Sequence, residues 1–329
     1  YGFGAENESV GELCFNTSMT GYQEILTDPS YAGQIINFTF PHIGNVGTNP
    51  IDMETSKPSV LGLVTRNRIT APSNWRNTQS FTEWLKKYNI PGISGIDTRA
   101  LTRKIRDEGA KTALLSSKKN ADFNLETIKN KIATWPGLKD MDLAKTVTCS
   151  ATTEWSGGLY QFDFEQKLSS GPNGTKSSGP NGTKKHKVIA IDFGAKHNIF
   201  RCLETANCEI ILLPANTTAN DVLSYNPDGI FLSNGPGDPE ATSKYSGSEI
   251  RTLVETGIPL FGICIGHQLL ALALGGSTSK MDRGHRGANH PVKDLTTNQI
   301  EITSQNHGFV VNEHDLPNSL EVTHRSLFD

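Results

Sequence analysis

The sequence has no strong excess of charge and no long apolar segment. Its 329 residues include 31 Lys and Arg against 34 Asp and Glu, a net charge of −3, and the basic residues form no continuous stripe. A balanced charge of this kind argues against nucleic acid or an anionic membrane as the principal partner. The longest apolar runs are far shorter than the roughly 20 residues that a membrane helix needs. We therefore expect a cytoplasmic protein that neither enters a membrane nor binds nucleic acid.

Cysteine is scarce and follows no pairing pattern. The five cysteines are odd in number, widely spread and without any C-x-x-C pair: Cys14, Cys149, Cys202, Cys208 and Cys264. This usage is typical of a reduced chain and indicates neither a disulfide framework nor a zinc site. The G-x-x-x-x-G-K-[S/T] spacing of a phosphate loop is also absent, so we expect no ATP bound in that way and no metal or other cofactor on this chain.

Three regions differ in character along the chain. Residues 1–150 predict a mixed unit of strands and capped helices, with strands at 11–15 and 34–40 and helices at 80–89 and 97–109. Residues 151–186 contain Ser-Ser-Gly-Pro-Asn-Gly-Thr-Lys twice in tandem, at 169–176 and 177–184. Turn formers of this kind cannot build a core, so we expect a flexible linker or surface loop there.

The third region, residues 187–329, alternates short apolar strands with helices. The expected strands lie at 188–193, 209–213, 229–233 and 258–263, and the expected helices at 198–204, at 249–255 and from 265 onward. Buried strands that alternate with helices predict a mostly parallel sheet with helices on both faces. The predicted fold class is therefore α/β, with this domain preceded by a smaller mixed α/β N-terminal domain. In such sheets ligands collect at the carboxyl ends of the strands.

Cys264 lies where an apolar strand ends and an apolar helix begins. Gly262 and Gly266 flank it in a G-x-C-x-G pattern, the thiol counterpart of the G-x-S-x-G nucleophile elbow. A strained turn lifts the nucleophile clear of the backbone, and the helix N-terminus favours a thiolate and offers N–H groups to an oxyanion. The alternative is a small buried thiol in an ordinary turn. His267 and Gln268, polar groups within the next helical turn, favour a catalytic cysteine.

A second signal follows the preceding strand, in the loop Ser233-Asn-Gly-Pro-Gly-Asp-Pro239. Its glycines and prolines predict a stiff loop whose backbone N–H groups can face a ligand, although a plain turn has the same composition. Consecutive units in such a sheet usually neighbour one another, so we expect the loop to lie beside Cys264. The two signals together favour a site that attacks a carbonyl group.

The motifs Asn234-Gly-Pro-Gly-Asp-Pro239 and Phe261-Gly-Ile-Cys-Ile-Gly-His-Gln268 resemble those of the class I glutamine amidotransferase family. More narrowly, nearly the whole chain resembles the small, glutaminase subunits of carbamoyl phosphate synthetase. Further segments that carry this resemblance are 15–31, 41–47, 96–99, 192–196, 289–293 and 305–309. The N-terminal unit is peculiar to that subunit among amidotransferases. The tandem repeat is a departure, which its position in a loop should make tolerable.

The resemblance implies hydrolysis of L-glutamine to glutamate and ammonia. Cys264 corresponds to the nucleophile that forms a glutamyl thioester, and the N–H groups of Ile265 and Gly237 correspond to the oxyanion donors. The matching glutamine-binding positions are Ser30, Gly235, Gln268, Asn306, Gly308 and Phe309. Since Ser30 belongs to the first region, the site should lie between domains. The ammonia would pass through a tunnel to the carbamoyl phosphate synthetase large subunit, which uses ATP, magnesium and bicarbonate in the pyrimidine and arginine pathways.

One departure from the family concerns the catalytic base. The family's histidine and glutamate lie in a His-Pro-Glu motif after a further strand, whereas this sequence begins at Tyr1 and stops at Asp329 before that motif. We therefore expect a C-terminally truncated copy that binds glutamine but turns over poorly, because a cysteine nucleophile needs an adjacent base. We expect four histidines to shape the site rather than to act as base or bind a metal: His267, His285, His290 and His307.

Two other functions are compatible with the sequence. The first is a catalytically impaired subunit that docks on a synthetase and regulates it, although a decayed site would often lose the thiol first. The second is the glutaminase of another synthetase, which the N-terminal unit disfavours.

Overall fold

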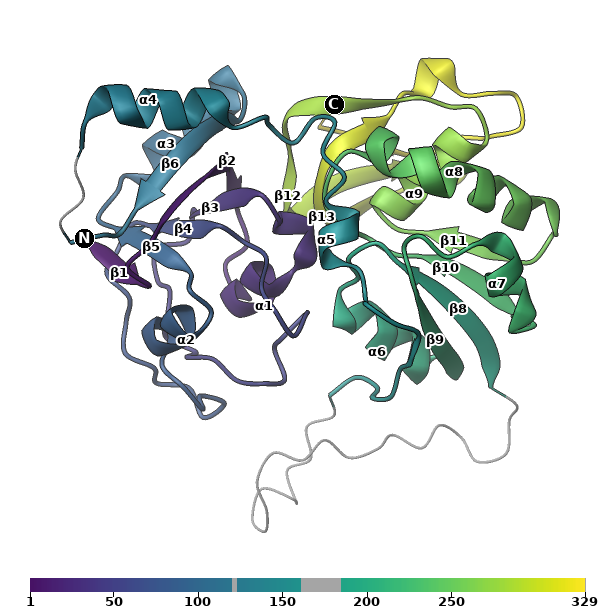
Figure 1. The fold of residues 1–329 in the computed structure, drawn as a ribbon, viewed down its shortest axis with the longest axis horizontal. Helices are drawn as coiled ribbons and strands as arrows, with labels where there is room; N and C mark the ends of the chain where they lie inside the picture. Colours follow the sequence, from purple (N-terminus) through teal and green to yellow (C-terminus); the bar gives the residue numbers. More distant parts are fainter. Residues whose placement is uncertain (120–122, 161–184, 329) are drawn as a thin grey trace, which may run out of the picture.

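The computed structural model describes residues 1–119, 123–160 and 185–328. They form two α/β lobes side by side, and a long β-hairpin lies at the junction of the lobes (Figure 1). The tandem repeat at 169–184, expected to be a linker or surface loop, lies outside the described residues. None of the helices within the described ranges is long and apolar enough to cross a membrane.

The first lobe is built on a six-stranded mixed sheet. In spatial order its strands are β1 (Gly2–Gly4), β5 (Pro91–Ser94), β4 (Gly62–Thr65), β3 (Gln34–Phe38), β2 (Glu8–Asn16) and β6 (Lys111–Ser116). The four central strands run parallel, whereas β1 and β6 are antiparallel edge strands. The strands expected at 11–15 and 34–40 correspond to β2 and β3.

Helices cover both faces of this first sheet. The helices of this part of the chain are α1 (Tyr22–Thr27), the 3-10 helix η1 (Pro29–Tyr31), α2 (Phe81–Lys87), α3 (Thr98–Glu108), α4 (Leu125–Thr134) and α5 (Ala144–Val147). Of these, α5 packs on the second lobe, because Ala144 belongs to the core around Ile189 and Ile191. α1 and α2 pack on one face and α3 on the other. The Ser80 hydroxyl accepts a hydrogen bond from the Glu83 N–H, and Asp97 accepts one from the Ala100 N–H. These caps confirm the two helices predicted in this region.

The second lobe is built on a five-stranded sheet. In spatial order its strands are β11 (Leu260–Gly262), β10 (Gly229–Leu232), β8 (His186–Asp192), β9 (Cys208–Pro214) and β7 (Thr153–Glu154). All neighbours pair in parallel except β7, which is antiparallel to β9. The mostly parallel sheet is therefore confirmed. β10 and β11 are adjacent. This arrangement agrees with the expectation that the loop after β10 lies beside Cys264, which follows β11.

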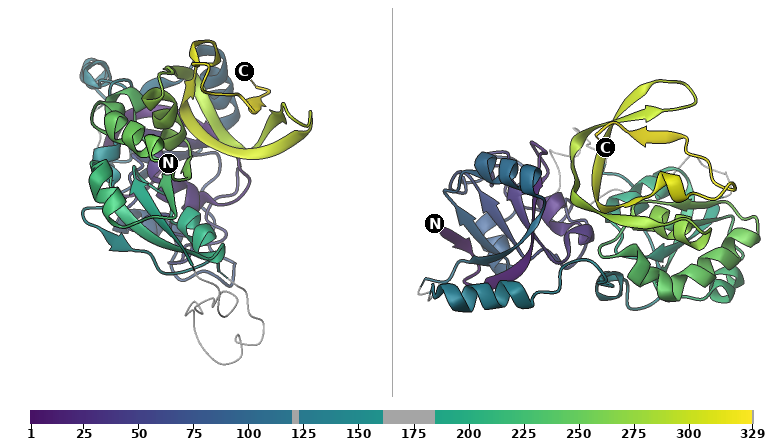
Figure 2. Two further views of the ribbon diagram at one scale, coloured as in Figure 1. Left: turned by 90° about the vertical axis from the view of Figure 1, so that its right-hand side faces the viewer. Right: turned by 90° about the horizontal axis from the view of Figure 1, so that it is seen from above.

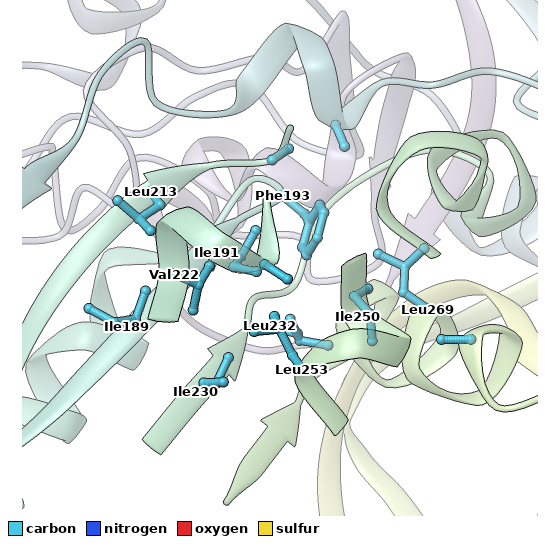
Figure 3. Packing of buried hydrophobic residues seen from close by; sticks show 14 of the residues in the cluster. Ile189, Ile191, Phe193, Leu213, Val222, Ile230, Leu232, Ile250, Leu253 and Leu269 are labelled. Carbon is cyan, nitrogen blue, oxygen red and sulfur yellow. The ribbon is translucent and has the colours of Figure 1, made fainter. Parts of the chain in front are cut away.

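Side chains of the second sheet alternate between two helical layers. The helices of this lobe are α6 (His197–Thr205), α7 (Ala219–Ser224), α8 (Pro239–Glu255) and α9 (Ile265–Ala273). Ile189, Ile191 and Leu232 pack against α7, α8 and α9 (Figure 3), whereas Ala190 and Phe231 face α6. This period of two along each strand places helices on both faces, as predicted.

A long antiparallel hairpin completes the described structure. It consists of β12 (Thr278–Asp294) and β13 (Ile300–Val311). The short strand β14 (His324–Ser326) pairs with the other edge of β12, and the 3-10 helix η3 (Glu313–Asp315) lies between β13 and β14 in the sequence. One end of the hairpin lies between the lobes and the other extends away from them (Figure 2). The sequence did not predict this hairpin, because register shifts between Lys280 and His285 and between Gly287 and His290 interrupt the alternation of side chains.

One predicted helix is longer than expected. The helix predicted at 249–255 is the last part of α8, which begins at Pro239. Asp238 caps it by accepting a hydrogen bond from the Glu240 N–H at 2.9 Å, and proline occupies the first helical position. The helix therefore starts at the end of the Ser233–Pro239 loop.

Candidate active site

Cys264 occupies the turn between β11 and α9 in a strained backbone conformation. Its φ of 54° and ψ of −112° lie outside the regions that residues with a side chain normally adopt. The flanking glycines allow this turn because a side chain would not fit. A Cβ on Gly262 would lie 2.6 Å from the Gly266 carbonyl carbon, and one on Gly266 would lie 2.2 Å from the Leu232 carbonyl oxygen. Close packing of α9 against β10 therefore holds the elbow.

The Cys264 sulfur lies among backbone polar groups. Its thiol donates a 3.6 Å hydrogen bond to the Asn306 carbonyl, and the N–H groups of Ile265 and Gly235 lie within hydrogen-bonding reach of it. Burial raises the pKa of the thiol to about 11; the Asp28 carboxylate adds to the rise, and the two N–H groups oppose it. The bias towards a thiolate that the helix N-terminus was expected to supply is therefore outweighed by burial.

The loop after β10 approaches the cysteine through backbone that only glycine can provide. A Cβ on Gly235 would lie 2.0 Å from the Phe193 carbonyl oxygen; Gly237 has a φ of 94°, and a Cβ there would lie 2.6 Å from the Met141 carbonyl oxygen. Asp238 is buried, and its carboxylate makes structural hydrogen bonds: it caps α8 and also accepts a 2.8 Å hydrogen bond from the Asp140 N–H.

Asp28 and Ser30 bring the first lobe into the site. Asp28 Oδ2 accepts a hydrogen bond from Asn306 Nδ2 at 2.9 Å and lies 3.6 Å from Lys196 Nζ. The other carboxylate oxygen accepts the Ser30 N–H at 2.9 Å. The Ser30 hydroxyl in turn accepts a 3.0 Å hydrogen bond from Asn234 Nδ2. The junction of the lobes is therefore a polar network around the cysteine.

Gln268 and the β-hairpin form the opposite wall. The Gln268 side chain is buried, and its Nε2 donates a 2.7 Å hydrogen bond to the Phe309 carbonyl. Asn306, three residues earlier on β13, provides the carbonyl that meets the Cys264 thiol. The hairpin is thus tied to α9 on either side of Gly308, which keeps this part of β13 over the elbow.

A single cavity is lined by eight of the nine predicted site residues. They are Ser30, Gly235, Gly237, Cys264, Gln268, Asn306, Gly308 and Phe309. The ninth, Ile265, is buried behind the elbow and reaches the sulfur only through its N–H. The structure therefore brings the predicted set together, while the role of each residue in binding or catalysis remains a prediction. The N–H of Gly235 also lies within hydrogen-bonding reach of the sulfur, while the donor role expected of Gly237 stays a prediction.

Sequence reasoning missed the charged residues of the site. Asp28 and Lys196 fall inside segments that carry the family resemblance, but no local pattern gave either of them a role. The Asp28 carboxylate raises the pKa of Lys196, with Glu54 and Cys264 as further contributors. A fixed ammonium group close to the cysteine is therefore part of the site. Arg286, which lines the cavity and is almost fully buried, was also missed.

Three of the four histidines near the motifs, His285, His290 and His307, lie on the hairpin, whereas His267 is exposed on α9. His307 Nδ1 lies 2.8 Å from the Phe309 carbonyl oxygen, and its Nε2 lies 3.0 Å from Gln305 Oε1. The same Gln305 oxygen lies 2.9 Å from His285 Nδ1, and the His285 ring packs against His290. These contacts suit the shaping role expected of the three hairpin histidines, while the role expected of His267 stays a prediction. In the ranges that the structure describes, no group of three His, Cys, Asp or Glu side chains could hold a metal ion.

Comparisons with known proteins cover nearly the whole chain. Residues 1–115 match the model of the carbamoyl-phosphate synthase small chain, CPSase domain, and residues 189–329 match the glutamine amidotransferase class-I model. Over the full length of this chain, the carbamoyl phosphate synthase small chain of Bradyrhizobium diazoefficiens is 50% identical and that of Ruegeria pomeroyi 52% identical. The chain covers 81% and 82% of those two proteins. The corresponding protein of Brucella canis is 51% identical, with 79% of it covered. These matches confirm the resemblance carried by the motifs.

The pKa of Cys264 predicts how its alkylation depends on pH. Because only the thiolate reacts and the pKa is about 11, the rate of alkylation by iodoacetamide should be low at pH 7. It should rise about tenfold per pH unit up to about pH 10. Mass spectrometry of the peptide that contains Cys264 measures this rate separately from the other four cysteines. A rate that levels off below pH 8 would contradict the structure.

The packing of the elbow predicts opposite effects for two glycine substitutions. Gly266→Ala should lower the free energy of unfolding by more than about 2 kcal/mol, because its Cβ would meet the Leu232 carbonyl. Gly247→Ala is the matched control: its Cβ would lie 3.7 Å from the nearest atom on α8, so it should stabilise the protein by about 0.5–1 kcal/mol. Urea unfolding measures the free energy of unfolding of each variant. Equal changes for the two substitutions would show that the elbow is not tightly packed.

Proposed function

Because this chain belongs to the family of carbamoyl phosphate synthase small chains, we propose that it hydrolyses glutamine to glutamate and ammonia through Cys264. The observation that carries the proposal is the position of Cys264. The cysteine stands in an elbow conformation in the wall of a cavity that also contains Ser30 from the first lobe, Gln268 from α9 and Asn306 from β13. A cavity with one nucleophile and several convergent polar groups suits a small polar substrate.

The cavity has groups for both ends of glutamine. The side-chain amide would lie at the Cys264 sulfur, where the N–H groups of Ile265 and of Gly235 or Gly237 would bind the oxygen. Each such donor is worth about 3 kcal/mol in comparable sites. Ser30 and the backbone around Gly308 would bind the α-ammonium and α-carboxylate groups, which glutamine shares with other amino acids. Selectivity for the amide would then come from the cysteine end.

The proposed reaction proceeds through two covalent steps. Cys264 Sγ attacks the amide carbon, a thioester forms as the carbon–nitrogen bond breaks, and the nitrogen leaves as ammonia with the thiol proton. Water then hydrolyses the thioester, which releases glutamate and restores the thiol. The thiol donates its hydrogen bond to the Asn306 carbonyl, which cannot take up the proton. Deprotonation of Cys264 is therefore expected to limit the rate, and this chain should bind glutamine more readily than it turns it over.

The ammonia would serve a second subunit. In the proposed scheme it passes through a tunnel to the carbamoyl phosphate synthase large subunit, where ATP, magnesium and bicarbonate are used to make carbamoyl phosphate for the arginine and pyrimidine pathways. The relatives from three bacteria, each named a small chain, support this assignment. Binding and hydrolysis of glutamine are then the part of the overall synthesis that this chain performs.

Replacing the nucleophile tests the proposal in the complex with the large subunit. Cys264→Ser should lower glutamine-dependent carbamoyl phosphate synthesis at least about a hundredfold, because the hydroxyl is a much weaker nucleophile, and should leave ammonia-dependent synthesis unchanged. Cys202→Ser, which replaces an exposed cysteine on α6, should change neither rate. If the unsubstituted chain supports no glutamine-dependent synthesis yet alters the ammonia-dependent rate, a docking or regulatory role replaces the proposed one.

A further inference from the structure

Glu12 is a buried carboxylate that joins the first lobe to the hairpin. It lies on β2, and its side chain is 8% exposed. Within the lobe, Gln34 Nε2 donates a 2.9 Å hydrogen bond to it. Across the junction, Lys280 Nζ lies 2.7 Å from one carboxylate oxygen, and Arg286 Nη2 lies 3.8 Å from the other. Both cations belong to β12, so a single negative charge of the first lobe holds two positive charges of the hairpin.

Arg286 connects this charge cluster to the cavity. Its side chain is 4% exposed, and it lines the same cavity as Cys264. It pairs across the hairpin with Asn306, whose carbonyl oxygen accepts the thiol hydrogen bond. A Cβ added to Gly308 would lie 3.3 Å from Arg286 Nη2, so the guanidinium packs directly beside that glycine. The position of Arg286 therefore sets the position of the backbone at 306–308.

Around Arg286 the strand pairing of the hairpin is limited to the three pairs from His285 to Gly287. Register shifts before His285 and after Gly287 interrupt the ladder on both sides of Arg286. The first lobe supplies the missing restraints: the Ala110 N–H donates to the Asp282 carbonyl at 2.7 Å, and the Thr17 N–H donates to the Arg286 carbonyl at 3.4 Å. These two contacts hold backbone. The buried guanidinium donates a 2.6 Å hydrogen bond from Nη1 to the Arg283 carbonyl, and Glu12 is the carboxylate that pairs with its charge. A buried cation that loses its partner must move or become hydrated, and the cavity is the space next to it.

We propose that Glu12 is a positioning residue for the glutamine site: it holds Arg286 and Lys280 so that Asn306 and Gly308 keep their places over Cys264. The inference rests on the proposed function, because it concerns the binding of glutamine at that site. Glu12 does not touch the cavity itself. It acts through Arg286, and its effect is on the affinity for glutamine rather than on the sulfur.

The test measures glutamine affinity through protection of Cys264. Iodoacetamide alkylates the thiol, bound glutamine shields it, and the glutamine concentration that halves the alkylation rate is determined for each variant. Glu12→Gln keeps the shape and removes the charge, so this concentration should rise at least about tenfold. Glu12→Asp keeps the charge, so its half-protecting glutamine concentration should lie between those of Glu12→Gln and the unsubstituted protein. Glu8→Gln is the matched control on the same strand. Glu8 pairs with Lys131 within the first lobe, so this substitution should leave the half-protecting glutamine concentration unchanged.

A role in stability alone would give a different result. It would produce a rapidly alkylated unfolded fraction, while the folded remainder would be protected at the original glutamine concentration. That pattern, or a Glu12→Gln value within about twofold of the unsubstituted protein, would overturn the inference and leave the proposed function intact. If glutamine protects Cys264 in no variant, including the unsubstituted protein, the proposed function fails and the inference fails with it.

A second variant applies if Glu12→Gln does not fold. Lys280→Gln removes the more exposed of the two cations and leaves Arg286 paired with Glu12. The half-protecting glutamine concentration should then rise by about threefold, less than for loss of the carboxylate. No change in this variant would overturn the inference.

Discussion

The carboxylate of Asp28 is the interaction on which the site depends. It is almost fully buried at the junction of the lobes, where it accepts hydrogen bonds from the Ser30 N–H and the Asn306 side chain and pairs with Lys196. These partners come from η1, from β13 and from the segment before α6. Because a buried charge is costly without partners, this carboxylate and its three partners stabilise one relative placement of the two lobes and the hairpin. The cavity depends on that placement, because its lining residues come from both lobes and the hairpin.

Two opposing constraints act on Cys264. Close packing of Gly262 and Gly266 holds its backbone in a strained conformation and puts the sulfur in the cavity wall, a position suited to attack. The same burial raises the pKa of the thiol, and the nearby Asp28 carboxylate adds to that effect. The elbow therefore determines where the nucleophile is, whereas its ionisation depends on charges around it. Glu12 and Asp28 have similar roles in this arrangement, since each is a first-lobe carboxylate that anchors the hairpin.

The parts of the structure with local signals could be predicted from the sequence. The strands β8 to β10 are short, largely buried apolar runs, and the helices α2 and α3 have capping residues, so each of these elements shows in a window of a few residues. The Cys264 elbow is local in the same way. The hairpin β12–β13 was missed because its register shifts remove the alternating pattern. Asp28 and Asn306 stand 278 residues apart, and only the folded chain shows that they meet.

The most direct test of this account is the crystal structure of the protein after reaction with a chloroketone analogue of glutamine. The account predicts a covalent bond to the Cys264 sulfur, the ketone oxygen on the N–H of Ile265 and of Gly235 or Gly237, and the amino-acid end between Ser30 and Gly308. Asp28 should still bind Asn306 in that structure. An adduct on another cysteine, or one that leaves the cavity empty and points away from Ser30 and Asn306, would contradict the account.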